Sequence, residues 1–158
     1  MGDFWSQGSN IKELKWIGLS KVNMAIKANQ YVQWSVNRYV GAFDKEGSLT
    51  KRSAGNGWNA GTYSRLGIKK KQKGVRGVSF LPLSNNKRLM VGLTSSGKDP
   101  SQSYKSITYA MYLNSGGNVE IYEKGSHKMK VGRYSAEDVM KIVLNHHGRI
   151  DYIVNDEI

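Results

Sequence analysis

The stretch 116–155 carries the hydrophobic alternation of β-hairpins nearly throughout, and this pattern constrains the fold more than any other feature of the sequence. Apolar residues alternate with polar ones over 140–144 and again over 150–154. A polar connection containing Gly148 joins the two runs and has the length of a hairpin loop. Successive side chains of a strand point to opposite faces, so each run buries one face. The sequence therefore predicts an antiparallel hairpin here.

The same alternation recurs along most of the chain, interrupted by turns. Strand-like runs return about every 8–12 residues, the spacing typical of β-sandwiches and barrels. The 158 residues include 18 glycines and 2 prolines, a ratio that favours many turns. About ten or more short strands are expected. The predicted fold class is all-β, an antiparallel β-sandwich of the jelly-roll or concanavalin A-like type.

The first 33 residues differ from the regular pattern that follows. Residues 34–158 are expected to form the sandwich domain, and 1–33 an N-terminal arm or an extra edge strand. The apolar residues over 11–19 suggest a short amphipathic helix or an irregular arm. Residues 22–26 alternate and predict a strand.

Three groups of segments resemble the concanavalin A-like lectin/glucanase superfamily, in particular its SPRY-like modules. The resemblance covers most of the chain from Trp34 onward, and it is carried by the order of segments 49–51, 57–64, 90–93, 107–111, 121–125, 134–142 and 148–155. It implies a sandwich whose ligand contacts lie in variable loops, so no binding residue follows from the motifs. Concanavalin-like relatives bind glycans, whereas SPRY-like relatives bind peptides and proteins. The family pattern continues beyond Asn155, so the domain is expected to be truncated at its C-terminus or completed by the N-terminal arm.

Positive charge is concentrated in the first half of the chain. The net charge is +12, of which residues 1–79 contribute 14 basic minus 4 acidic residues, or +10. A field of this sign favours an anionic partner such as nucleic acid or another polymer. A solvated turn that protects a sheet edge is the alternative, and both remain open. The candidate anion-binding residues are Lys69, Lys70, Lys71, Lys73 and Arg76, with Lys51 and Arg52.

A second candidate site lies in the loops. Amide side chains beside an aromatic ring are typical of a sugar-binding cleft. The residues predicted to form such a cleft are Asn85, Asn86, Asp99 and Tyr104.

No catalytic or metal-binding constellation emerges from the sequence. A retaining glycosidase needs two carboxyls about 5–5.5 Å apart. Glu120 and Glu123 are three residues apart, so they should point to opposite faces of a strand. The chain lacks cysteine, and the adjacent His146 and His147 are expected to diverge in a turn without further ligands. No enzyme activity, metal or cofactor is predicted.

The expected function is a non-catalytic recognition module that docks a protein or scaffold partner through loops and a basic face. The alternatives are a carbohydrate-binding module and a salt-sensitive binder of nucleic acid or another anionic polymer. No apolar run is long enough to span a membrane. The lack of cysteine and of a signal peptide favours an intracellular location, cytoplasmic or cytoskeletal.

Overall fold

A computed structural model describes residues 13–18, 22–26, 30–31, 58, 61–69, 76–95 and 103–156, and this part of the chain is built from strands. A short 3-10 helix, η1, spans Tyr104–Ser106. No helix among these residues is long and apolar enough to cross a membrane. The prediction of an all-β fold is confirmed. The strands are β1 Glu13–Gly18, β2 Val22–Ile26, β3 Gln30–Tyr31, β4 Thr62–Lys69, β5 Gly77–Pro82, β6 Leu89–Thr94, β7 Tyr109–Leu113, β8 Asn118–Glu123, β9 Ser126–Arg133, β10 Met140–Leu144 and β11 Ile150–Val154.

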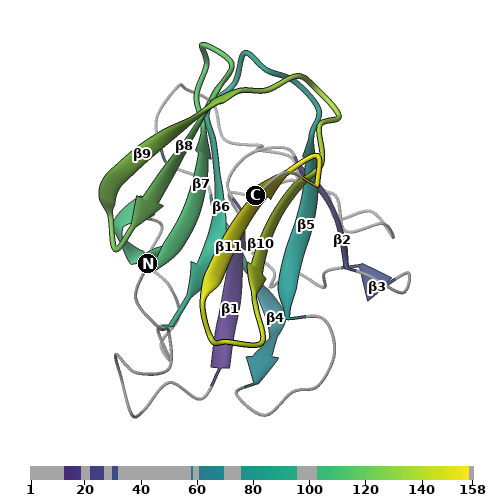
Figure 1. Cartoon of the computed structure of the whole chain (residues 1–158), viewed down its shortest axis with the longest axis vertical. Helices are drawn as coiled ribbons and strands as arrows, with labels where there is room; N and C mark the ends of the chain where they lie inside the picture. The colour runs from purple at the N-terminus through teal and green to yellow at the C-terminus, as the bar shows by residue number, and fades with distance from the viewer. Residues whose placement is uncertain are drawn as a thin grey trace.

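The strands form two antiparallel sheets (Figure 1). The six-stranded sheet has the order β4-β1-β6-β7-β8-β9, and the five-stranded sheet has the order β11-β10-β5-β2-β3. The predicted hairpin is present as β10 and β11, with Ile142 opposite Tyr152. A polar turn over 145–149 joins the two strands, as expected from the sequence.

The first two strands, β1 and β2, lie inside the sheets, whereas β3 forms an edge of the five-stranded sheet. β1 pairs with β4 on one side and with β6 on the other, and β2 pairs with β3 and β5. The helix interpretation of residues 11–19 is therefore wrong for 13–18, because pairing with strands distant in sequence overrides a weak local periodicity. The strand predicted over 22–26 is confirmed.

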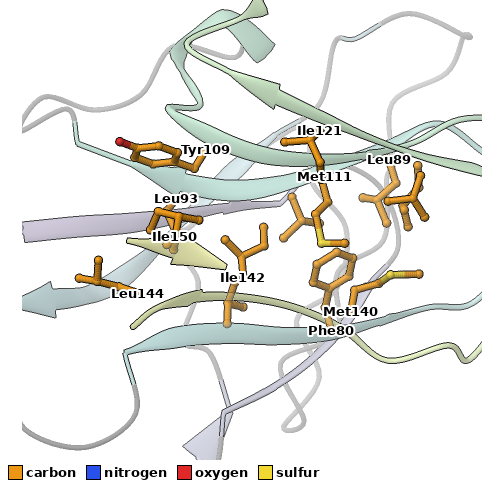
Figure 2. Packing of buried hydrophobic residues seen from close by; sticks show 14 of the residues in the cluster. Phe80, Leu89, Leu93, Tyr109, Met111, Ile121, Met140, Ile142, Leu144 and Ile150 are labelled. Atoms are coloured by element: carbon orange, nitrogen blue, oxygen red, sulfur yellow. The ribbon is translucent and has the colours of Figure 1, made fainter. Parts of the chain in front are cut away.

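One hydrophobic core lies between the two sheets (Figure 2). Figure 2 shows Met111 pointing from the six-stranded sheet towards Phe80 and Met140 of the five-stranded sheet. Burying this apolar surface is the main favourable contribution to folding. The alternation read from the sequence thus places the inward residues of β10 and β11 correctly. The buried residues of this core are Ile68, Val78, Phe80, Leu89, Val91, Leu93, Tyr109, Met111, Leu113, Val119, Ile121, Tyr134, Met140, Ile142, Leu144 and Ile150.

Strand β6 is buried on both faces. Leu89, Val91 and Leu93 belong to the core between the sheets, whereas Met90 belongs to a second cluster on the opposite face. Gly92 also lies on that opposite face. A Cβ atom at Gly92 would lie 2.2 Å from the carbonyl oxygen of Tyr109 and 2.3 Å from Cγ2 of Ile107. Glycine is therefore required here for the close approach of neighbouring chain segments.

We expect Gly92→Ala to lower the free energy of unfolding by about 2 kcal/mol or more, because the added methyl group meets backbone that cannot rotate away. Gly132 of β9 is the matched control, since a Cβ atom there would meet nothing within 4 Å. Gly132→Ala should change the free energy of unfolding by no more than about 0.5 kcal/mol. Urea denaturation of both variants provides the measurement, and equal losses would contradict the close approach at Gly92.

A hydrogen bond joins the two sheets near one edge of the core. The Tyr152 hydroxyl of β11 donates to Oε1 of Glu123 in β8, at 3.2 Å. Burial, together with the negative charge of Glu123, raises the pKa of Tyr152 well above its usual value of about 10. The folded chain therefore holds the phenol proton at a pH where the unfolded chain has released it.

This difference predicts a loss of stability at alkaline pH. The contribution of Tyr152 to the free energy of unfolding is fully present below about pH 10, the pKa of tyrosine in the unfolded chain. It is lost as the pH rises above that value. In Tyr152→Phe, the free energy of unfolding should fall less steeply between about pH 9 and pH 11. Glu123→Gln keeps an acceptor but removes the charge, and should leave the slope close to that of the wild type, because burial is the larger cause of the raised pKa. A wild-type slope in Tyr152→Phe would refute the assignment.

Candidate functional site

The structure describes only a small part of the predicted basic surface. Lys51, Arg52, Lys70, Lys71 and Lys73 lie outside the described residues. Lys69 is the last residue of β4, and its side chain is likewise not described.

Arg76 is described, and its side chain is engaged within the fold. Nη2 of the guanidinium donates to the carbonyl oxygen of Asn145 at 2.6 Å. The carbonyl oxygen of Arg76 in turn accepts from the backbone nitrogen of Leu144 at 2.7 Å. These two hydrogen bonds connect the residue before β5 to the end of β10 and the turn that follows it.

The predicted loop residues are divided between two places. Asn85 and Asn86 line an open pocket, here called the loop pocket, of about 510 Å³ at one end of the sheets. Tyr104 belongs instead to the aromatic cluster on the outer face of the six-stranded sheet. Asp99 lies outside the described residues. The loop pocket is formed where three loops meet, and its lining is Asn85, Asn86, Ser115, Gly116, Gly117, Arg133, Tyr134, Ser135 and Asp138.

Hydrogen bonds hold the turn between β7 and β8 against the chain that follows β9. Oδ1 of Asn114 accepts from the backbone nitrogens of Gly116 at 2.9 Å and Asn118 at 3.1 Å. Gly117 has a φ of 73°, the left-handed region that glycine adopts without a steric penalty. Its carbonyl oxygen accepts from the backbone nitrogen of Tyr134 at 2.9 Å. This wall of the loop pocket is consequently ordered before any ligand arrives.

Asp138 holds another part of the lining of the loop pocket. Its Oδ2 accepts from the backbone nitrogen of Ser135 at 2.7 Å, and its Oδ1 accepts from Nδ2 of Asn155 at 3.0 Å. Amides, hydroxyls, one guanidinium and one carboxylate thus surround the loop pocket. Such groups are suited to hydrogen-bonding a small polar ligand.

The second arrangement is a group of rings on the outer face of the six-stranded sheet. This aromatic face consists of Trp58, Tyr104, Tyr112, Tyr122 and His127. Four of the rings form a closed cycle with centroid distances of 6.4 Å for Trp58–Tyr104, 6.5 Å for Tyr104–Tyr122, 5.7 Å for Tyr122–Tyr112 and 5.6 Å for Tyr112–Trp58. The His127 ring lies 5.4 Å from Tyr122. Edge-on and tilted contacts at these separations are favourable.

The aromatic face rests on buried residues and carries polar groups at its margin. Met90, Ile107 and Ala110 form its base. The Glu120 carboxylate accepts from Nδ2 of Asn114 at 2.7 Å and lies 3.7 Å from Nε2 of His127. Burial and the charge of Glu120 raise the pKa of the Tyr122 hydroxyl. That hydroxyl is therefore a neutral hydrogen-bond group at physiological pH.

The two carboxylates of β8, Glu120 and Glu123, lie on opposite faces of the strand. Glu120 lies with the outer aromatic face, whereas Glu123 bonds to Tyr152 of the other sheet. The prediction that the two point to opposite faces is confirmed.

His146 and His147, in the turn between β10 and β11, differ in one respect from what the sequence predicted. The rings of His146 and His147 have centroids 3.7 Å apart, so the expected divergence is wrong. Both side chains are exposed at the turn between β10 and β11. Across the residues with described placement, no group of three or more His, Asp or Glu side chains could hold a metal ion.

Most of the aromatic face was missed by the sequence analysis, which selected Tyr104 alone. Trp58, which was not among the predicted site residues, is half-buried in this aromatic face. The sequence did contain a signal for this face. Tyr112 and Tyr122 lie on two consecutive strands, and each directly follows a residue that faces the core. An aromatic residue at the polar position of a strand marks an outer surface that is not simply solvated.

The chain matches no protein-family model, no curated protein and no solved structure. Its function is therefore inferred from the loop pocket and the aromatic face.

Proposed function

We propose that this chain is a non-catalytic recognition module that docks a protein partner through the aromatic face. The closed cycle of Trp58, Tyr104, Tyr122 and Tyr112 carries this proposal. Tryptophan and tyrosine combine large apolar surfaces with a polar tip, and they dominate the energetics of protein interfaces. The assignment to SPRY-like, concanavalin A-like jelly rolls belongs to the same proposal and is supported by two antiparallel sheets around one core.

The packing of the rings favours binding. Each ring of the cycle is half-buried and contacts two others, so its rotamer is restricted before a partner arrives. Docking then loses less side-chain entropy than it would at freely rotating groups. The margin formed by Asn114, Glu120 and His127 supplies hydrogen-bond groups around the apolar centre, the usual anatomy of an interface.

The double variant Trp58→Ala/Tyr104→Ala should lower the retention of a specific protein partner by about tenfold or more. Neither residue lies in a strand, so the sheets should stay folded, which circular dichroism verifies. The measurement is affinity capture from the source-cell lysate at low and at high salt, with bound proteins quantified by mass spectrometry. His146→Ala/His147→Ala, which removes two exposed rings elsewhere, is the control and should keep wild-type retention. A partner held equally by both double variants would refute the aromatic face as the docking surface.

A second candidate function, glycan binding, is favoured by the lining of the loop pocket. Its amide, hydroxyl, guanidinium and carboxylate groups can form hydrogen bonds with sugar hydroxyls, and hydrogen bonds within and between the loops hold the lining in place. This candidate retains Asn85 and Asn86 of the predicted cleft.

If the loop pocket binds a glycan, Asn86→Ala should weaken that binding about fivefold, the effect of losing one hydrogen bond of about 1 kcal/mol. Lys87 is exposed and is not part of the lining, so Lys87→Ala provides the neighbouring control. A glycan array screened with the wild type identifies the probe, and calorimetry compares the variants. Absence of any retained glycan would eliminate this candidate and leave protein docking.

A further inference from the structure

Strand β9 forms an exposed edge of the six-stranded sheet. It pairs with β8, and it is the last strand in the order β4-β1-β6-β7-β8-β9 (Figure 1). Among the described strands, none pairs with its other side. Every residue of β9 except Gly132 is exposed. One row of backbone donors and acceptors along β9 therefore faces away from β8, as at any sheet edge.

The side chains of β9 combine positive charge with exposed apolar groups. β9 contains two lysines, one arginine and one histidine, which are Lys128, Lys130, Arg133 and His127, and it contains no acidic residue. Met129 is 56% exposed and Val131 is 47% exposed. These are the two most exposed large hydrophobic side chains in the described residues. Solvation alone accounts for the lysines of an edge strand, but it does not account for this apolar surface.

Where the register of β9 assigns a residue to a face, the apolar and the basic side chains lie on different faces, and only Lys128 and Val131 fall at the register shifts. Met129 lies opposite Ile121, whose side chain is in the core, so Met129 is on the inward face. Lys130 lies opposite Glu120, and His127 lies opposite Tyr122, both on the outer face. A strand added beside β9 would meet an apolar neighbour on one face and basic neighbours on the other.

We propose that β9 binds an extended, acidic segment of a partner protein as an additional antiparallel or parallel strand. Its apolar residues would cover Met129, and the acidic residues alternating with them would lie beside Lys130 and His127. Backbone hydrogen bonds supply affinity in such strand addition, and alternating side chains supply specificity. This inference deepens the proposed function by stating the form and charge of the partner, and it rests on that function.

Edge lysines and bulges also prevent sheets from aggregating. The pairing of β9 with β8 shifts register twice, between Val119 and Glu120 and between Ile121 and Tyr122. Two β9 edges would repel one another because both are basic. The same charge attracts an acidic strand, so protection against self-association and selection of an acidic partner are compatible.

The test uses a fluorescent eight-residue peptide of alternating glutamate and valine, titrated against the full chain by fluorescence anisotropy. Two further peptides carry N-methyl groups on all glutamates or on all valines, which removes one set of backbone donors each. Only one set can face β9, so one N-methylated peptide should lose binding by at least about tenfold while the other retains it. Lys128→Glu/Lys130→Glu should also weaken the unmodified peptide by about tenfold.

The control Lys87→Glu/Arg149→Glu changes the same net charge at exposed positions outside β9 and should bind the peptide nearly as the wild type does. No binding of the unmodified peptide, equal binding of both N-methylated peptides, or equal loss in both charge variants would each overturn the inference. A protein partner that is lost with Trp58→Ala/Tyr104→Ala but retained by Lys128→Glu/Lys130→Glu would leave the proposed function intact and refute the role of β9 alone.

Discussion

The core shared by the two sheets is the constraint on which the other features depend. Its residues occupy every second position of β7 and β8, such as Met111 and Ile121. The intervening positions must then face outward, and in these strands they hold Tyr112 and Tyr122. The place of the aromatic face is therefore a geometric consequence of burial on the other side of the same strands.

The three surfaces differ in what holds them in place. Strand register and buried neighbours position the aromatic face, whereas turn hydrogen bonds from Asn114 and Asp138 shape the loop pocket. The β9 edge is supported from one side, by β8. A rigid surface suits a preformed partner, and an edge suits a flexible segment that becomes ordered as it binds.

Local interactions were readable from the sequence and distant ones were not. The β10–β11 hairpin was predicted because alternation and turn chemistry lie within a short stretch, where Asn145 accepts from the backbone nitrogens of His147 and Arg149 at 3.0 Å each. β1 was missed because its partners, β4 and β6, are far along the chain. Tyr104 was selected as an isolated ring because only the folded chain brings it to Trp58. A count of charges likewise could not reveal that Arg76 bonds to Asn145.

The interior position of β1 constrains when the six-stranded sheet can form during synthesis of the chain. Trp16 lies opposite Leu93, and Glu13 lies opposite Lys69. The strands that pair with β1 are therefore synthesised much later than β1 itself. During that interval its backbone groups have no sheet to join. Non-local pairing of this kind slows folding, and an unpaired strand can associate with other chains. Nascent chains of this protein are therefore expected to depend on chaperone protection until β6 has left the ribosome.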